Sequence, residues 1–177
     1  MTQDWYLYDI TTGAHRNLTA DLGVTFWNED TDTPGLPRPY SASTWVENEE
    51  YFLIGDRYDL WQFDPKGEKA PFMITEGLGK ATNNNFKVAR PIHDPKAKRT
   101  RFGNAAGPLK VGEPLYFSSF NRVTREHGFY MKDITKKKAK MVKLAEGPYN
   151  MSVSGISLSN EYPGIAQVGK SQKPPRK

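Results

Sequence analysis

The serines of this sequence lack the setting that would make one of them a nucleophile. A hydrolase serine is held on a strained strand-to-helix turn with the pattern Gly-x-Ser-x-Gly. The nearest match is Ser157 in Gly155-Ile-Ser-Leu-Ser159, where the second glycine is missing. The chain also contains no cysteine, which excludes disulfides, thiolate metal ligands and a cysteine nucleophile. We therefore predict that the chain has no catalytic residue and is not an enzyme by itself.

The histidines and acidic residues do not form the pattern of a metal site. His15, His93 and His127 are far apart in the sequence and each lies in a predicted turn, whereas a metal ion needs ligands that converge. The acidic run Asn28-Glu-Asp-Thr-Asp32 lacks the spacing and the closing glutamate of a calcium loop. We predict no metal and no cofactor, and a solvent-exposed loop at residues 28–32.

Two further groups could bind a polar ligand, but each also has a structural explanation. Asp56, Arg57 and Asp59 could form a charged site, or Arg57 could bridge neighbouring turns, and we favour the bridge. Gly77-Leu-Gly79 resembles the beginning of a phosphate loop. No third glycine, no Lys-Ser/Thr pair and no following helix completes that motif. The sequence alone therefore leaves the substrate-binding residues unknown.

Short strands joined by an aspartate turn would position these residues. In Leu60–Phe63, Trp61 and Phe63 fall on one face of a period-two ribbon. The turn Asp64-Pro-Lys-Gly67 follows, in which the aspartate can accept a hydrogen bond from the backbone two residues on. A second apolar run, Phe72–Thr75, closes the hairpin.

Looser copies of this hairpin occur twice more, around Asp9 and around Asp133. Strand-and-turn units that recur in this way are typical of a β-propeller, in which each blade is one repeat. Residues 129–145 also have spacings that a helix could partly use, but the alignment with the other two hairpins favours strands. Trp45, Trp61 and Tyr116 are expected to pack between blades.

The chain is thus predicted to be all-β, a partial β-propeller with about two complete four-stranded antiparallel blades plus partial ones. Residues 1–177 would form a single domain, with these parts: the end of one blade (1–20), an inter-blade loop (21–38), a blade (39–76), a blade with an insertion (83–146) and the start of the next blade (150–177). A closed propeller needs at least four blades. The chain is therefore expected to be a segment of a larger protein, or to self-associate through exposed blade edges.

Composition agrees with a β-rich chain and argues against two classes of partner. Aromatic residues make up 12%, and the chain has 15 Gly and 13 Pro. The net charge is +5, but the basic clusters flank turns and a chain end, where lysines normally keep loops soluble. We predict no nucleic-acid partner. No run of about 18 apolar residues could span a membrane, and residues 1–5 do not begin a secretory signal.

Three stretches resemble the β-propeller domain of the prolyl oligopeptidase family of serine peptidases, including its dipeptidyl peptidase IV-like and acylaminoacyl peptidase-like members of bacterial type. The most specific is Asp56-Arg-Tyr-Asp-Leu-Trp-Gln-Phe-Asp-Pro-Lys-Gly67; the others are Leu18-Thr19 with Val24–Glu29, and Phe117–Asn121 with Thr124 and Gly128–Tyr130. Together they span about residues 5–146. The amino-terminus-binding glutamate pair of that family has no recognisable counterpart, and that role is not transferred to Glu49-Glu50.

The resemblance implies a propeller that caps an α/β-hydrolase domain carrying a Ser–Asp–His triad, with both absent from this chain. The expected role is steric: strands at Ser41–Thr44, Phe86–Ala89 and Ser152–Ser154 would line a channel that admits short peptides. The expected partners are the hydrolase domain and, in the parent protein, a peptide substrate. A periplasmic or exported parent fits the resemblance, and a cytoplasmic one stays open. The alternative is a stand-alone propeller-like module that binds a ligand or protein and has no link to proteolysis.

Overall fold

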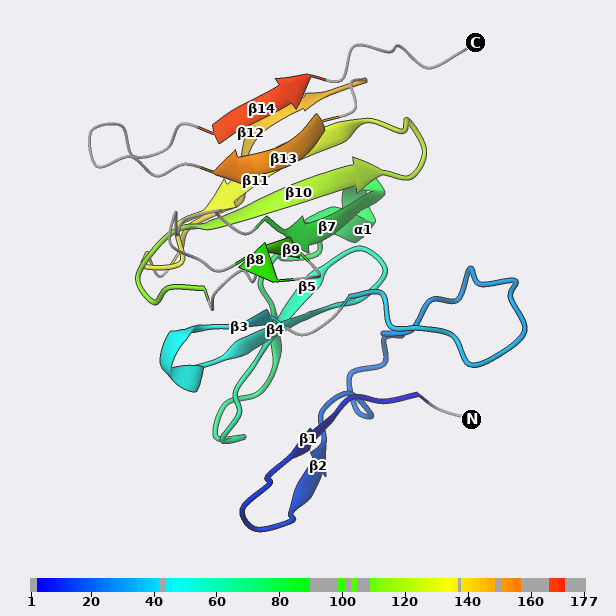
Figure 1. Cartoon of the computed structure of the whole chain (residues 1–177), viewed down its shortest axis with the longest axis vertical. Coiled ribbons are helices and arrows are strands. Elements are labelled where there is room, and N and C mark those ends of the chain that lie inside the picture. The colour runs from blue at the N-terminus through cyan, green and yellow to red at the C-terminus, as the bar shows by residue number, and fades with distance from the viewer. Residues whose placement is uncertain are drawn as a thin grey trace.

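The computed structural model describes residues 3–41, 44–89, 99–100, 103–104, 109–136, 138–148, 151–156 and 166–170. Within these ranges the chain forms strands in antiparallel sheets and very little helix (Figure 1). The predicted all-β class is confirmed. Ser157, the nearest match to the nucleophile pattern, lies outside the described residues, and so does His93.

Two four-stranded sheets form the centre of the molecule. The first sheet has the order β3-β4-β5-β6, with bounds Thr44–Trp45, Phe52–Gly55, Leu60–Phe63 and Phe72–Met73. The second sheet has the order β7-β10-β11-β12, with bounds Asn84–Val88, Leu115–Asn121, His127–Lys132 and Val142–Gly147. In both sheets, neighbouring strands pair antiparallel. Residues 129–145 therefore contribute strands and not a helix, as predicted.

Three separate two-stranded hairpins complete the described strands. They are β1 and β2 (Tyr6–Tyr8 and His15–Asn17), β8 and β9 (Arg99–Thr100 and Gly103–Asn104), and β13 and β14 (Met151–Ile156 and Ala166–Lys170). Among the described strands, no sheet closes on itself. The propeller arrangement and the division into blades thus stay predictions.

Two helical segments interrupt the strands. A 3-10 turn, Glu47–Glu49, links β3 to β4, so Glu49-Glu50 lies in the connection between two strands as predicted. The helix α1, Leu78–Thr82, lies between β6 and β7. The prediction that no helix follows Gly77 was wrong. The strand predicted over Phe72–Thr75 is also shorter, because the chain turns at Ile74 after β6 ends at Met73.

The aspartate turns have the geometry that the sequence predicts. The first carboxylate oxygens of Asp9, Asp64 and Asp133 each accept a hydrogen bond from the backbone N–H two residues on, at Thr11, Lys66 and Thr135, over 2.8, 2.8 and 3.1 Å. Such bonds favour the charged carboxylate. They hold the pKa of Asp9 and Asp64 below the usual range. Each turn is therefore stabilised by its own residues.

The first sheet is buried on both of its faces. One face packs against the second sheet in a core that includes Leu53, Leu60, Phe86 and Phe117. The opposite face carries Phe52, Ile54 and Phe63, which pack with Phe26 and with residues of the β1–β2 hairpin and its following loop. Trp61 packs on the same side as Phe63, whereas Leu60 faces the other core. This separation follows from the alternation of side chains along a strand.

Candidate functional site

The turn between β4 and β5, Asp56–Asp59, contains the charged residues that the sequence singled out. Asp56 stabilises the turn itself: one carboxylate oxygen accepts hydrogen bonds from the backbone N–H groups of Tyr58 and Asp59, both at 2.7 Å. Its other oxygen accepts a hydrogen bond from the indole N–H of Trp61 at 2.8 Å. Asp56 is therefore occupied by its own turn and by the adjacent strand.

Arg57 bridges neighbouring segments, as predicted. Its guanidinium contacts one carboxylate oxygen of Asp30 at 2.7 Å, and the guanidinium of Arg122 contacts the other at 2.5 Å. Asp30 lies in the loop before the first sheet, and Arg122 lies in the turn between β10 and β11 of the second sheet. The backbone carbonyl of Arg57 also accepts a hydrogen bond from the side chain of Asn85 at 2.6 Å. The arrangement joins three segments, and both oxygens of Asp30 are already paired.

Asp59 is buried and joins the two sheets through their connection. The residue is 1% exposed. Its carboxylate accepts hydrogen bonds from the hydroxyl of Thr75 at 2.6 Å and from the backbone N–H groups of Gly79 and Lys80 at 2.9 and 3.0 Å. A buried charge is tolerated only when it is paired or fully hydrogen-bonded, and here two of the three donors, the N–H groups of Gly79 and Lys80, belong to α1. Asp59 thus fixes α1 against the first sheet and is not available to a ligand.

Gly79 is required by packing. A Cβ at this position would lie 2.4 Å from the carbonyl oxygen of Tyr58. The pair of glycines that resembled a phosphate loop is therefore explained by a close backbone approach. The helix α1 has five residues, and its amide groups at Gly79 and Lys80 are used by Asp59.

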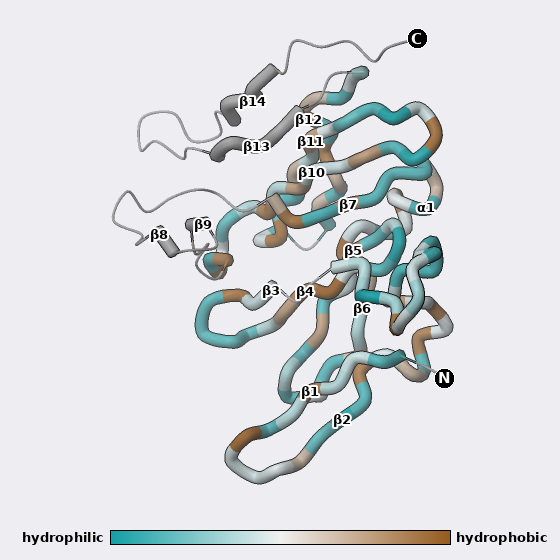
Figure 2. The backbone as a smooth tube through the Cα atoms, turned by 45° about the vertical axis from the view of Figure 1, so that its right-hand side comes forward, coloured by the Kyte–Doolittle hydropathy of each residue, from teal (hydrophilic) through white to brown (hydrophobic). Residues whose placement is uncertain are grey.

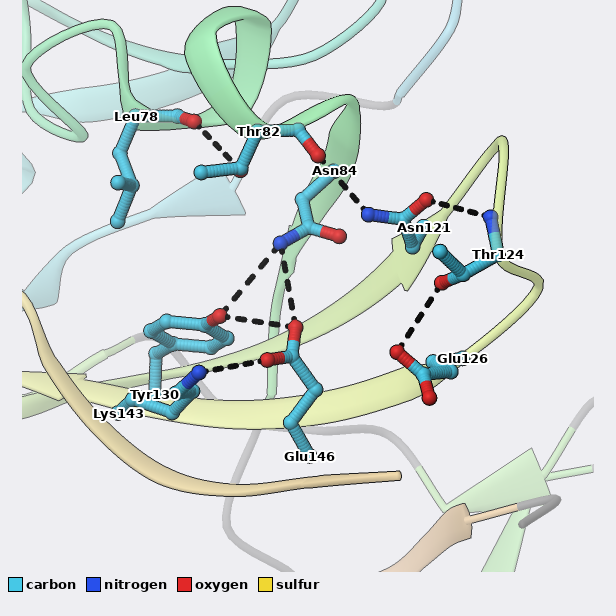
Figure 3. A network of polar contacts seen from close by, with 9 residues as sticks. All are labelled: Leu78, Thr82, Asn84, Asn121, Thr124, Glu126, Tyr130, Lys143 and Glu146. Atoms are coloured by element: carbon cyan, nitrogen blue, oxygen red, sulfur yellow. Dashed lines mark hydrogen bonds and ion pairs between the residues drawn. The ribbon is translucent and has the colours of Figure 1, made fainter. Parts of the chain in front are cut away.

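A second polar network lies on the second sheet and is drawn in Figure 3. The phenol of Tyr130 donates a hydrogen bond to Glu146 at 3.2 Å, and Lys143 contacts the other oxygen of Glu146 at 2.7 Å. The amide of Asn84 donates weakly to both Tyr130 and Glu146, over 3.5 Å in each case. The hydrogen bond from Lys143 lowers the pKa of Glu146. Burial, together with the charge of Glu146, raises the pKa of Tyr130 to about 12. This phenol stays protonated near neutral pH and acts as a hydrogen-bond donor.

Asn121 links α1 to the turn between β10 and β11. Its side-chain N–H donates to the carbonyl oxygen of Thr82 at 2.8 Å, and its oxygen accepts from the N–H of Thr124 at 2.8 Å (Figure 3). Figure 3 shows this group beside the Tyr130 network. The polar residues of this region therefore connect structural elements to one another.

The strands predicted to line a channel lie at sheet edges. β3 and β7 are each the first strand of their sheet, and each forms a backbone hydrogen bond with a residue outside that sheet: the Leu109 N–H donates to the carbonyl oxygen of Trp45 at 3.0 Å, and the Phe86 N–H donates to the carbonyl oxygen of Tyr58 at 2.9 Å. Phe86 of β7 faces the core between the sheets, with 2% exposure, and Lys87 is exposed. Positions 42 and 43 and the side chains of residues 152–154 lie outside the description. The channel stays a prediction.

Two of the three aromatic residues that were predicted to pack between blades do pack against a core, and the blades themselves stay a prediction. The predicted setting of the histidines is wrong for His15 and His127. Trp45 and Trp61 pack against the core on the outer face of the first sheet, whereas Tyr116 is half-buried outside both cores. His15 lies in β2 and His127 in β11, in strands instead of turns. Among the described residues, no group of three or more His, Asp or Glu could hold a metal ion. No helix in the described ranges is long and apolar enough to cross a membrane.

A pocket with a volume of about 380 Å³ lies where β2 and its following loop meet the turn between β5 and β6. Arg16 enters it and donates hydrogen bonds to the carbonyl oxygens of Asp64 and Pro65 at 3.0 and 3.1 Å. A Cβ on Gly67 would lie 1.5 Å from the Arg16 guanidinium. Sequence reasoning missed this contact, although Gly67 had been placed correctly in the turn.

Comparisons of the chain with protein-family models, with curated proteins and with solved structures found no match. The resemblance to the prolyl oligopeptidase family therefore depends on the residues quoted above, and its functional consequences are proposals.

Proposed function

We propose that this chain is a non-catalytic β-propeller segment of a prolyl oligopeptidase-family serine peptidase. Its role would be to restrict the access of peptides to a hydrolase domain that this chain does not contain. The observation that carries the proposal is the pair of successive four-stranded antiparallel sheets packed face to face. Stacked sheets of this size, each one unit of the chain, are what adjacent propeller blades require.

The most specific part of the resemblance, the Asp56–Trp61 run, also has a physical role that suits a repeated sheet. Arg57 and Asp59 connect the first sheet to the loop before it and to the segment after it, and Asp56 stabilises the turn that carries them. In a propeller, each blade must be held at a defined angle to both neighbours, because it contacts only those neighbours. The run therefore fits a joint between blades better than a ligand site.

The gene region downstream of Lys177 provides the first test. The proposal requires a following hydrolase region with a Gly-x-Ser-x-Gly nucleophile elbow in the same reading frame. A stand-alone binding module requires none. If the sequenced region encodes no such elbow, the peptidase proposal is overturned.

The activity of the chain alone provides the second test. We expect no hydrolysis of chromogenic dipeptide substrates, whereas the full-length parent should cleave them and lose that activity on treatment with a serine-directed phosphonate. The parent should also cleave short peptides and spare folded proteins. Turnover by the 177-residue chain that the phosphonate abolishes would contradict the proposed role.

A further inference from the structure

The β1–β2 hairpin has an unpaired edge on β1. Leu18 donates its N–H to the carbonyl oxygen of Trp5 at 2.8 Å, so the backbone polar groups of Trp5 point toward β2. Successive residues of an antiparallel strand point their N–H and C=O groups to opposite edges. Those of Tyr6 and Tyr8 therefore point away from β2. Among the described strands, none pairs with this edge.

The same hairpin also exposes an apolar face. Leu7 packs toward the first sheet, and its neighbours Tyr6 and Tyr8 on the opposite face are 56% and 61% exposed. Ile10, in the hairpin loop, is 89% exposed, and Figure 2 shows a hydrophobic segment at this tip, away from the sheets. A further strand would pair with this edge, and a neighbouring sheet would cover this apolar face.

The order of strands in the complete sheets identifies the missing neighbour. In both complete sheets, the third and fourth strands are followed by the connection to the next sheet. β1 and β2 are followed by the connection to the first sheet, so they occupy the third and fourth places. β13 and β14 follow the second sheet, so they occupy the first and second places. The strand that belongs beside β1 is therefore one in second place, as β14 is.

The two half-sheets of one chain do not meet. β1–β2 and β13–β14 lie at opposite ends of the long axis of the molecule (Figure 1). The end near β12 also exposes apolar residues, Val142 and Leu144, at 47% and 46%. Val142 pairs with Met131, whose position alternates with that of the core residue Tyr130, so Val142 lies on the face turned away from the first sheet. Each end of the stack thus offers an apolar face beside a half-sheet.

We propose that the 177-residue chain binds a second copy of itself head to tail. β14 of one copy pairs antiparallel with β1 of the next, and β13–β14 with β1–β2 form one four-stranded sheet. The exposed face of Tyr6 and Tyr8 then lies against the second sheet of the partner copy, near Val142 and Leu144. Such an interface is heterologous and produces a ring, if the rotation between copies closes, or a filament. This inference goes beyond the proposed function and does not depend on the peptidase assignment.

A matched pair of proline variants tests the inference on the full chain. Tyr8 and His15 are directly opposite one another in the hairpin. The Tyr8 N–H points away from β2, to the open edge of β1 where β14 of the other copy would pair, whereas the His15 N–H points away from β1, to the opposite edge of the hairpin. Proline removes the N–H at either position. We expect wild type and His15→Pro to self-associate with increasing concentration in size-exclusion chromatography with light scattering. Tyr8→Pro should weaken self-association at least about tenfold, the factor that corresponds to 1.4 kcal/mol and hence to about one hydrogen bond.

A second pair decides the outcome if Tyr8→Pro disturbs the fold, as judged by circular dichroism. Tyr6→Lys places a charge on the exposed face, and Val123→Lys makes the same kind of change at a position that is 71% exposed in the turn between β10 and β11. Only Tyr6→Lys should reduce self-association. A wild-type chain that is monomeric at every concentration, or self-association that neither Tyr8→Pro nor Tyr6→Lys reduces, overturns the inference. Either result leaves the peptidase proposal to its own test on the downstream gene region.

Discussion

The carboxylate of Asp59 accepts a hydrogen bond from the backbone N–H of Gly79 at 2.9 Å, across the connection between the first and the second sheet. Asp59 is the last residue of the turn before β5, and Gly79 lies in α1, just before β7. The place where the chain leaves one sheet is thus coupled to the place where it enters the next. Because this contact joins a buried carboxylate to a backbone N–H, we expect substitutions at Asp59 or Gly79 to lower the free energy of unfolding.

Replacing Asp59 should be among the most destabilising single changes in the chain. Asp59→Ala leaves the buried Thr75 hydroxyl and two amide groups without their acceptor, which should lower the free energy of unfolding by about 3 kcal/mol or more. Asp59→Asn keeps one acceptor oxygen and should lose less. Urea unfolding measures both. Asp32→Ala, in an exposed loop, serves as the control, and a similar loss in the control variant would contradict the assignment.

The close approach at Gly79 predicts a clash with any side chain. Gly79→Ala would place a Cβ 2.4 Å from the carbonyl oxygen of Tyr58, so the backbone must shift, at a cost of about 1–3 kcal/mol. At an ordinary helical position, replacing glycine by alanine stabilises the helix. A loss of stability in Gly79→Ala would therefore identify the clash as its cause. Lys80→Ala, in the same helix and exposed, should be nearly neutral. A Gly79→Ala variant as stable as wild type in thermal unfolding would refute the packing argument.

The ion pairs of Asp30 should contribute modestly and should depend on salt. The side chains of Asp30, Arg57 and Arg122 are 39%, 31% and 34% exposed, and exposed pairs typically contribute at most about 1 kcal/mol. Asp30→Asn should therefore lower stability by about that amount at low salt, and by less at high salt because ions screen the pairs. Denaturant unfolding at two salt concentrations checks this. A loss that does not change with salt would indicate that the loop packs for another reason.

Tyr130 should make the protein sensitive to alkaline pH. Its folded pKa is raised to about 12, above the ordinary value of about 10. A raised pKa contributes stability that is fully present below pH 10 and is lost as pH rises through 12. Tyr130→Phe removes the hydrogen bond to Glu146, at a cost of about 1 kcal/mol near neutral pH. The difference in unfolding free energy between wild type and this variant should shrink between pH 10 and 12. A difference that stays constant over this range would show that ionisation of Tyr130 is not coupled to folding.

Local chemistry explains which parts of the fold could be predicted from the sequence. The alternation of Leu60 against Trp61 and Phe63 assigned side chains correctly to the two faces of β5. The turns at Asp9, Asp64 and Asp133 were predictable because each aspartate bonds to its own neighbours. Such signals are contained in a few consecutive residues.

What could not be predicted depends on distant residues. α1 has five residues, too few for a periodic pattern, and two of its amide groups bond to Asp59, about twenty residues earlier. The contact between Asp30 and Arg122 spans 92 residues, so no local sequence pattern predicts it. Phe86 packs in the core between the two sheets, and this role depends on the neighbouring sheet and not on β7 alone. In each case the tertiary neighbour, and not the segment itself, decides the role.

The guanidinium of Arg16 occupies the space that a side chain on Gly67 would need. Because the hydrogen bonds of the arginine within the described part of the chain go to backbone carbonyls of that turn, the identity of the residues at 64 and 65 matters little to it, and the lack of a side chain at 67 matters greatly. Positions 16 and 67 should therefore change together in evolution. A lineage that replaces the glycine should also shorten the arginine, and homologous sequences would record this as a correlated exchange.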